Sequence, residues 1–60
     1  MIDLKELRTA KGLTQEQLAK ECEVQRTTIT MIELGENKPS VELAKKLGVI
    51  FEVDWKGFFE

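Results

Sequence analysis

The sequence lacks most of the residues on which catalytic and metal-binding sites are built. Among its 60 residues there is no histidine and no tyrosine, and Cys22 is the single cysteine. An internal disulfide and a zinc site of histidines and cysteines are therefore excluded. Acid–base catalysis would fall to carboxylates or lysines in a deep pocket, which a chain of this size can hardly build. There is no glycine-rich phosphate loop or nucleophile–base pair. We expect no enzyme, no metal and no cofactor.

Long apolar runs and an excess of basic residues are also absent. The longest apolar run, residues 48–51, is far too short to span a membrane, and no segment has the pattern of a secretory signal. We therefore expect a cytoplasmic protein without membrane contact, in which Cys22 is a small buried apolar residue. The 9 basic and 11 acidic side chains give a net charge of −2. Any nucleic-acid function must therefore depend on where the charges lie.

Cap residues divide the chain into five short helical segments. Thr14 and Gln17 have the spacing of a capping box, as do Asp3 and Glu6, and Ser40 can cap the helix after the single proline. No stretch alternates with the period of a strand, so the expected fold class is all-α. We expect residues 1–60 to form a single domain, with helices over about 4–11, 15–22, 25–34 and 41–52 and then a final turn and a half.

The fourth predicted helix has a clear apolar face. Val41, Ala44, Leu47 and Phe51 recur at helical spacing on one side, which predicts that this side is buried. Gly48 lies on the same side, although glycine weakens a helix. A close approach of another helix at this position is the expected reason.

The third predicted helix, residues 25–34, has two unlike faces. One sector is suited to burial and contains Gln25, Thr28, Ile29 and Ile32. The opposite sector has one long cation, two hydroxyls and a thioether, and no carboxylate; it contains Arg26, Thr27, Thr30 and Met31. Arginine can fork onto guanine, a threonine can reach either kind of base edge, and methionine can pack on the thymine methyl in a DNA major groove. An ordinary surface helix is an equal alternative on these residues alone.

The spacing from Gln15 to Leu34 resembles the helix-turn-helix of the Cro and phage-repressor family, also called the Xre family. The resemblance is carried by T-Q-E-Q-L-A-K at 14–20, I-T-M-I-E at 29–33 and K-P-S at 38–40. It extends through P-S-V-E-L-A-K-K-L and D-W-K-G-F-F, and so covers nearly the whole chain. It implies a compact five-helix, lambda-repressor-like domain whose second and third helices form the motif, with the third in the major groove.

The resemblance also implies roles for individual residues. Four residues on the outer face of the third helix become candidate base readers: Arg26, Thr27, Thr30 and Met31. Residues near the helix ends become candidate contacts to the DNA backbone: Thr14, Gln15, Gln25, Lys38 and Ser40. In this family Gln15 would also brace Arg26. Arg8 and Glu33 match a pair that forms an internal salt bridge, which gives Arg8 a structural role.

Three residues depart from the family pattern. Glu23 stands in the turn where glycine is common, which predicts strain or an altered turn. Gln25 replaces the usual serine or threonine cap and weakens the start of the third helix. Leu34 replaces an asparagine, which removes a side-chain contact but leaves the backbone N–H. None of these changes removes a core position.

The resemblance implies a sequence-specific regulator of transcription, and a repressor of a phage or mobile element is the expected role. An antitoxin or a restriction-modification controller would have the same sequence features. A protein-interaction module on this scaffold is an alternative of another class, which the net negative charge favours. Because one copy offers few cations, we expect a homodimer on double-stranded DNA. Candidate dimer contacts are Trp55, Phe58 and Phe59. Closure of the core is the alternative for all three and the main role expected of Trp55 and Phe58, whereas Phe59 is the expected exposed anchor.

Overall fold

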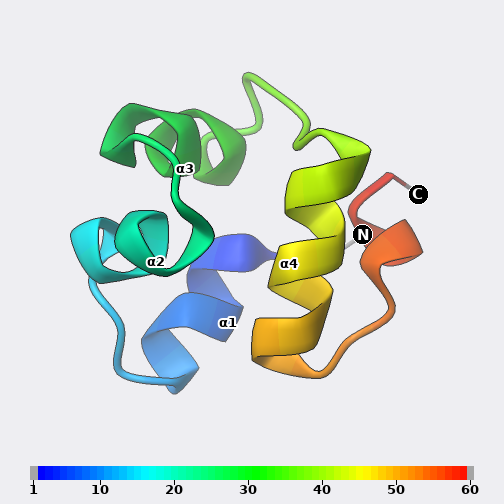
Figure 1. The fold of residues 1–60 in the computed structure, drawn as a ribbon, viewed down its shortest axis with the longest axis horizontal. Coiled ribbons are helices and arrows are strands. Elements are labelled where there is room, and N and C mark those ends of the chain that lie inside the picture. Colours follow the sequence, from blue (N-terminus) through cyan, green and yellow to red (C-terminus); the bar gives the residue numbers. More distant parts are fainter. Residues whose placement is uncertain (1, 60) are drawn as a thin grey trace.

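The described residues form four α-helices and one 3₁₀ helix, and Figure 1 shows how these elements are arranged in space. The computed structural model describes residues 2–59, so Met1 and Glu60, at the ends of the predicted domain, lie outside the described residues. The elements are α1 Leu4–Ala10, α2 Gln15–Cys22, α3 Arg26–Glu33, α4 Val41–Phe51 and η1 Trp55–Phe59. No strand occurs in the described part, and the all-α prediction is confirmed there. The count of five helices is confirmed only in part, since the last of the five described elements is a short 3₁₀ helix.

The predicted caps fix where the helices begin. In α2 the capping box is complete: the Gln17 N–H donates to Thr14 Oγ1 at 3.0 Å, and the Thr14 N–H donates to Gln17 Oε1 at 2.8 Å. In α1 only half of the predicted box forms, the bond of 3.2 Å from the Glu6 N–H to Asp3 Oδ1. Ser40 Oγ accepts from the Leu43 N–H at 3.1 Å. The ends of α1, α3 and α4 each fall one residue inside the predicted ranges.

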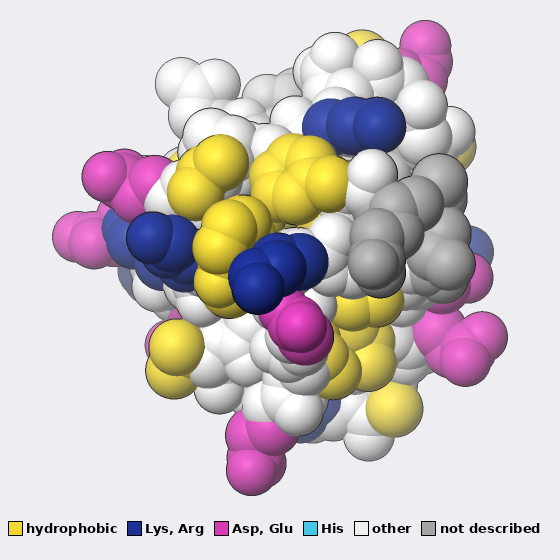
Figure 2. All heavy atoms as spheres, turned by 90° about the vertical axis from the view of Figure 1, so that its right-hand side faces the viewer, with side chains coloured by type: hydrophobic (Ala, Val, Ile, Leu, Met, Phe, Trp, Pro, Cys, Tyr) yellow, Lys and Arg dark blue, Asp and Glu magenta, His cyan; other side chains and the backbone are white. Residues whose placement is uncertain are grey.

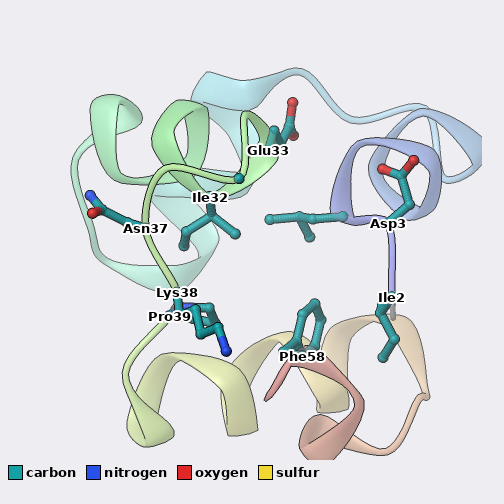
Figure 3. Close-up of a pocket in the computed structure, with 10 residues that line it drawn as sticks. Ile2, Asp3, Ile32, Glu33, Asn37, Lys38, Pro39 and Phe58 are labelled. Carbon is teal, nitrogen blue, oxygen red and sulfur yellow. The ribbon is translucent and has the colours of Figure 1, made fainter. Parts of the chain in front are cut away.

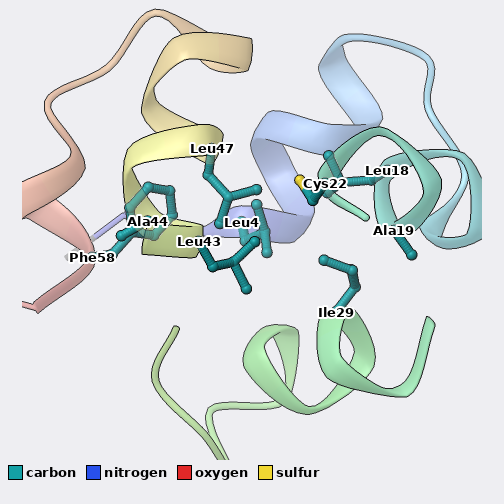
Figure 4. Close-up of a cluster of buried hydrophobic side chains, with 9 residues drawn as sticks. All are labelled: Leu4, Leu18, Ala19, Cys22, Ile29, Leu43, Ala44, Leu47 and Phe58. Carbon is teal, nitrogen blue, oxygen red and sulfur yellow. The ribbon is translucent and has the colours of Figure 1, made fainter. Parts of the chain in front are cut away.

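The core lies where the four α-helices and η1 meet, as Figure 4 shows. Its buried apolar residues are Leu4, Leu18, Ala19, Cys22, Ile29, Leu43, Ala44, Leu47 and Phe58. Cys22 is fully buried, as predicted. Val41 is 52% exposed, so its predicted burial is wrong. The buried stripe of α4 is centred on residues 43–48, and Val41 lies about 90° away from it around the helix.

Gly48 allows the chain to fold back against α4. A Cβ atom at this position would lie 2.9 Å from the Val53 carbonyl oxygen and 3.1 Å from Trp55 Cβ. The predicted close approach is therefore confirmed, and the neighbour is the segment that leads into η1. Glu52 makes this return possible, since its φ of 56° ends α4 in a left-handed conformation.

The turn between α2 and α3 contains the predicted strain. Glu23 has φ 59° and ψ 41°, a left-handed conformation that favours glycine. Lys46 supports the turn: its Nζ donates to the Cys22 carbonyl oxygen at 3.3 Å and lies 3.6 Å from Glu23 Oε1. This turn sets the direction in which α3 leaves α2.

Candidate nucleic-acid interface

The helix α3 turns its isoleucines inward and its arginine outward. Ile29 is fully buried, and Ile32 packs against the core. Arg26 and Thr27 are exposed. Thr30 and Met31 are half-exposed. The predicted burial of Gln25 is wrong: this residue is exposed, because it is the N-cap that precedes α3 and has no side-chain cap hydrogen bond.

The outward face of α3 carries no carboxylate. The single acidic residue of the helix is Glu33, which turns inward with a side-chain exposed fraction of 4%. Glu16 of α2 is an exposed acid beside this face, since it lines the same two shallow hollows as Arg26. Arg26 makes no salt bridge with a described residue. Its guanidinium is therefore available to an outside partner.

A buried ion pair fastens α3 to α1. Arg8 Nε donates to Glu33 Oε2 at 2.6 Å, and its Nη2 donates to Glu33 Oε1 at 3.2 Å. The Nη1 atom donates to the Leu13 carbonyl oxygen at 2.8 Å. Arg8 is 8% exposed. The guanidinium thus forks onto the carboxylate and fixes the position of α3 relative to α1 and the loop before α2.

Each residue of this pair stabilises the charged form of the other. Burial by itself raises the pKa of Glu33, but the hydrogen bonds from Arg8 and Gln15 and the positive charges nearby outweigh it and lower the pKa from its ordinary value. The hydrogen bond to Glu33 raises the pKa of Arg8, against the effect of burial. Glu33 is therefore a carboxylate at neutral pH, and its oxygens only accept hydrogen bonds.

Gln15 links this pair to the surface of α3. Its Nε2 donates to Glu33 Oε1 at 2.9 Å, and its Oε1 accepts from Thr30 Oγ1 at 2.9 Å. Gln15 makes no hydrogen bond to Arg26 in the described part of the chain, so its amide braces Thr30 instead of the arginine. Sequence reasoning missed this link, because it joins residues 15 positions apart through a turn whose geometry is set by tertiary packing.

The candidate backbone contacts fall into two groups. Thr14 and Gln15 line one hollow together with Arg26, so they lie beside the outward face of α3. Lys38 and Ser40 line another hollow with Thr28, an inner-face residue of α3. Gln25 is exposed at the start of the helix. The structure therefore brings the first group next to Arg26, whereas Lys38 and Ser40 flank the other side of α3.

Behind α3 lies an apolar hollow of about 310 Å³. Ile32 and Phe58 point into it, and Asn37, Lys38 and Pro39 form one side, as Figure 3 shows. None of the four candidate base readers lines it. The hollow is thus separate from the outward face of α3.

The opposite side of the molecule carries an apolar surface on α4 and η1, seen in Figure 2 as hydrophobic side chains beside lysines. We call Val49, Lys45, Trp55 and Phe59 the α4–η1 surface. Val49 is 80% exposed, and Trp55 and Phe59 are half-exposed in an edge-to-face pair with centroids 6.2 Å apart. Lys45 Nζ lies 5.4 Å from the centre of the Trp55 ring. Phe58 belongs to the core, and sequence reasoning missed the exposure of Val49.

None of the helices among residues 2–59 has the length and apolar character needed to cross a membrane. No group of three or more side chains of cysteine, aspartate or glutamate is arranged there to hold a metal ion.

Comparison with known proteins gives consistent matches. The model of a family described as helix-turn-helix matches residues 4–58. An uncharacterized HTH-type transcriptional regulator of Bacillus subtilis, YqaF, is 49% identical over 57 residues, which are 95% of this chain and 75% of that protein. MJ0272 of Methanocaldococcus jannaschii, another uncharacterized regulator of this type, is 45% identical over 93% of this chain and 85% of its own length. The transcriptional activator BcrR of Enterococcus faecalis is 46% identical over 83% of this chain but only 24% of BcrR.

Proposed function

We propose that this chain recognises a specific double-stranded DNA sequence with α3 in the major groove. The premise is that the chain belongs to the helix-turn-helix family of DNA-binding transcriptional regulators. The observation that carries the proposal is the outward face of α3. On this face Arg26 has no salt bridge to a described residue. The face also carries no carboxylate, because Glu33 is held inside by Arg8. A DNA groove lined with phosphates attracts such a surface, whereas a carboxylate there would be repelled.

The proposed contacts follow from the positions of the side chains. Arg26 and Thr27 are exposed at the start of α3, where a recognition helix contacts base edges. Thr30 and Met31 follow one turn later on the same face. The backbone N–H groups at the start of α2, beside Thr14 and Gln15, would bind a phosphate. Further proposed contacts to the DNA backbone are Lys38, Ser40 and Gln25. In this proposal the whole chain acts as one DNA-binding domain.

Selection of bound duplexes from a random pool, followed by titration at two salt concentrations, tests this proposal. We expect one preferred site and an affinity that falls steeply as salt rises, since each neutralised phosphate releases counterions. Arg26→Ala should relax the preference at one base pair and weaken binding by about 1–3 kcal/mol. Lys56→Ala is the matched control: it removes one exposed cation from η1, across α4 from α3, and should change neither quantity. Equal affinity for random and selected duplexes would refute sequence-specific binding.

We also propose that two copies bind together. A single copy offers few cations, and a two-fold dimer would double its phosphate contacts on half-sites about one helical turn apart. The α4–η1 surface supports this, because it leaves Val49, Trp55 and Phe59 partly or largely exposed on the side away from α3. Val49→Lys should prevent dimer formation on DNA, as measured by sedimentation, while leaving the melting temperature unchanged. A monomer bound to a non-palindromic site would exclude the dimer.

A repressor of a phage or mobile element is the proposed regulatory role. Repression requires only that a bound protein blocks the promoter, which the DNA-binding surface can do without a second interaction. Activation is the second candidate, since the similar protein BcrR is named an activator. Transcription in vitro from a promoter that contains the selected site separates the two: reduced transcript supports repression, and increased transcript supports activation.

A further inference from the structure

A chain of hydrogen bonds leads from the buried ion pair to the outward face of α3. It begins at Arg8, whose guanidinium holds the Glu33 carboxylate. It continues from Glu33 Oε1 to Gln15 Nε2 at 2.9 Å, and from Gln15 Oε1 to Thr30 Oγ1 at 2.9 Å. Each link limits which atom can donate in the next one. The order of donors and acceptors along the chain therefore decides how Thr30 faces a partner.

The buried charge fixes the orientation of the Gln15 amide. Glu33 is ionised and can only accept, so the group facing it must be the NH₂ end of the amide. The reverse orientation would set the amide oxygen against a carboxylate that is nearly excluded from solvent. The oxygen of Gln15 therefore faces Thr30. An amide is free to face either way in water, but here the ion pair removes that freedom.

The Thr30 hydroxyl can then only accept a hydrogen bond from an outside partner. Besides Gln15 Oε1, the hydroxyl has one other hydrogen-bond partner among the described residues, the Arg26 carbonyl oxygen at 3.2 Å. Both neighbours accept, and a hydroxyl has a single proton. Whichever neighbour takes the proton, the hydroxyl presents only lone pairs to the outside. Thr27, in contrast, is exposed with no side-chain hydrogen bond to a described residue, so its hydroxyl can rotate to donate or to accept.

We propose that Thr30 is a specificity-determining residue that acts as a fixed hydrogen-bond acceptor and recognises an exocyclic amino group in the major groove, either N6 of adenine or N4 of cytosine. This inference rests on the proposed function, because it requires α3 to lie in the groove. The other polar atoms on the major-groove edges, N7 and O6 of guanine, N7 of adenine and O4 of thymine, are acceptors. They cannot bond to a hydroxyl that presents lone pairs. Thr30 thus favours sites in which an amino group lies opposite it.

Base analogues test this polarity directly. The base pair opposite Thr30 is first located as the position at which Thr30→Val loses preference in the selected site. The adenine or cytosine there is then replaced by purine or 2-pyrimidinone, each of which lacks only the amino group. We expect the wild-type protein to lose about fivefold more affinity than Thr30→Val on this replacement, the size of one hydrogen bond. Comparison with Thr30→Val removes the effect of the weakened base pair itself, because both proteins meet the same duplex.

Thr27→Val is the matched control, since it removes from the same face a hydroxyl that can either donate or accept a hydrogen bond. Equal losses for the wild-type protein and Thr30→Val would overturn the inference. So would a wild-type protein that loses more than Thr30→Val when a base acceptor is removed, for example with 7-deazaguanine, because the hydroxyl would then be a donor. If the wild-type protein selects no site at all, the proposed function fails as well, and this result is distinct from a selected site that ignores the amino group.

Discussion

Breaking the ion pair between α1 and α3 should remove a large part of the stability of this domain. Arg8→Met keeps an unbranched stem but leaves the Glu33 carboxylate, 4% exposed, with only the hydrogen bond from Gln15. An unpaired buried charge typically costs about 3–5 kcal/mol. Sixty residues at roughly 0.05–0.15 kcal/mol each give a total of about 3–9 kcal/mol. We therefore expect Arg8→Met to be marginally folded at room temperature.

Thermal and urea unfolding followed by circular dichroism would measure this effect. In a domain of this size each kcal/mol corresponds to about 4–8 °C, so the melting temperature should fall by at least about 12 °C. Lys20→Met is the matched control, because Lys20 is exposed on α2 and its replacement should change stability by less than about 0.5 kcal/mol. The double variant Arg8→Met/Glu33→Leu should recover most of the loss, since two apolar residues leave no buried charge.

The outcome that refutes this reasoning is specific. If Arg8→Met and Glu33→Leu each cost less than about 1 kcal/mol, or if their costs simply add in the double variant, the two side chains are not coupled. The pair would then be solvated in the manner of an exposed salt bridge. The fork of Arg8 onto Glu33 could not, in that case, fix the position of α3.

Because the folded-state pKa of Glu33 is lowered, its contribution to stability is present above the ordinary pKa of 4.5 and is lost as pH falls through the folded-state pKa. The free energy of unfolding of Glu33→Gln should therefore fall less steeply with decreasing pH than that of the wild-type protein, and an equal slope would contradict this prediction. Gly48→Ala should cost about 1–3 kcal/mol by overpacking, measured by urea unfolding, whereas Val49→Ala beside it should have little effect. Glu23→Gly should raise the melting temperature and stabilise the fold by up to about 1 kcal/mol, because the left-handed strain at Glu23 exceeds the entropy cost of glycine. A lower melting temperature would show that the lost contact with Lys46 outweighs the relief of strain. Burial raises the pKa of the Cys22 thiol and covers it, so alkylation should require unfolding, and rapid alkylation of the folded protein would be inconsistent with this core.

The sequence predicted best the features that depend on neighbouring residues. The capping box of Thr14 and Gln17 needs only a spacing of three, and it forms as predicted. The strain at Glu23 was expected from the family resemblance, in which glycine is common at this position of the turn, and the left-handed backbone confirms it. The positions of the helices were predicted to within one residue at each end, because caps act over a single turn.

The features that the sequence did not predict depend on how helices pack. Val41 has the right spacing for burial, yet no described element covers its side of α4. Gly48 lets residues 53–55 return close to α4, and the element that begins at Trp55 is a 3₁₀ helix. The bond between Gln15 and Thr30 requires α2 and α3 to cross at a particular angle, and that angle is set by the turn at Glu23 and by the core around Ile29. Periodicity assigns a residue to a face but does not say what lies opposite that face.

The ion pair explains how a slightly acidic chain can present a DNA-binding surface in the proposed function. An acidic residue in α3 would repel phosphate if it pointed outward, and Arg8 prevents this by holding Glu33 within the fold. The same carboxylate orients Gln15, and Gln15 orients the hydroxyl of Thr30. Removing Glu33 would therefore do more than destabilise the fold: it would free the amide to face either way and let Thr30 donate as well as accept. Stability and the polarity of the recognition surface are thus coupled through one buried charge, so variants at Glu33 should be compared for base preference only at temperatures where they remain folded.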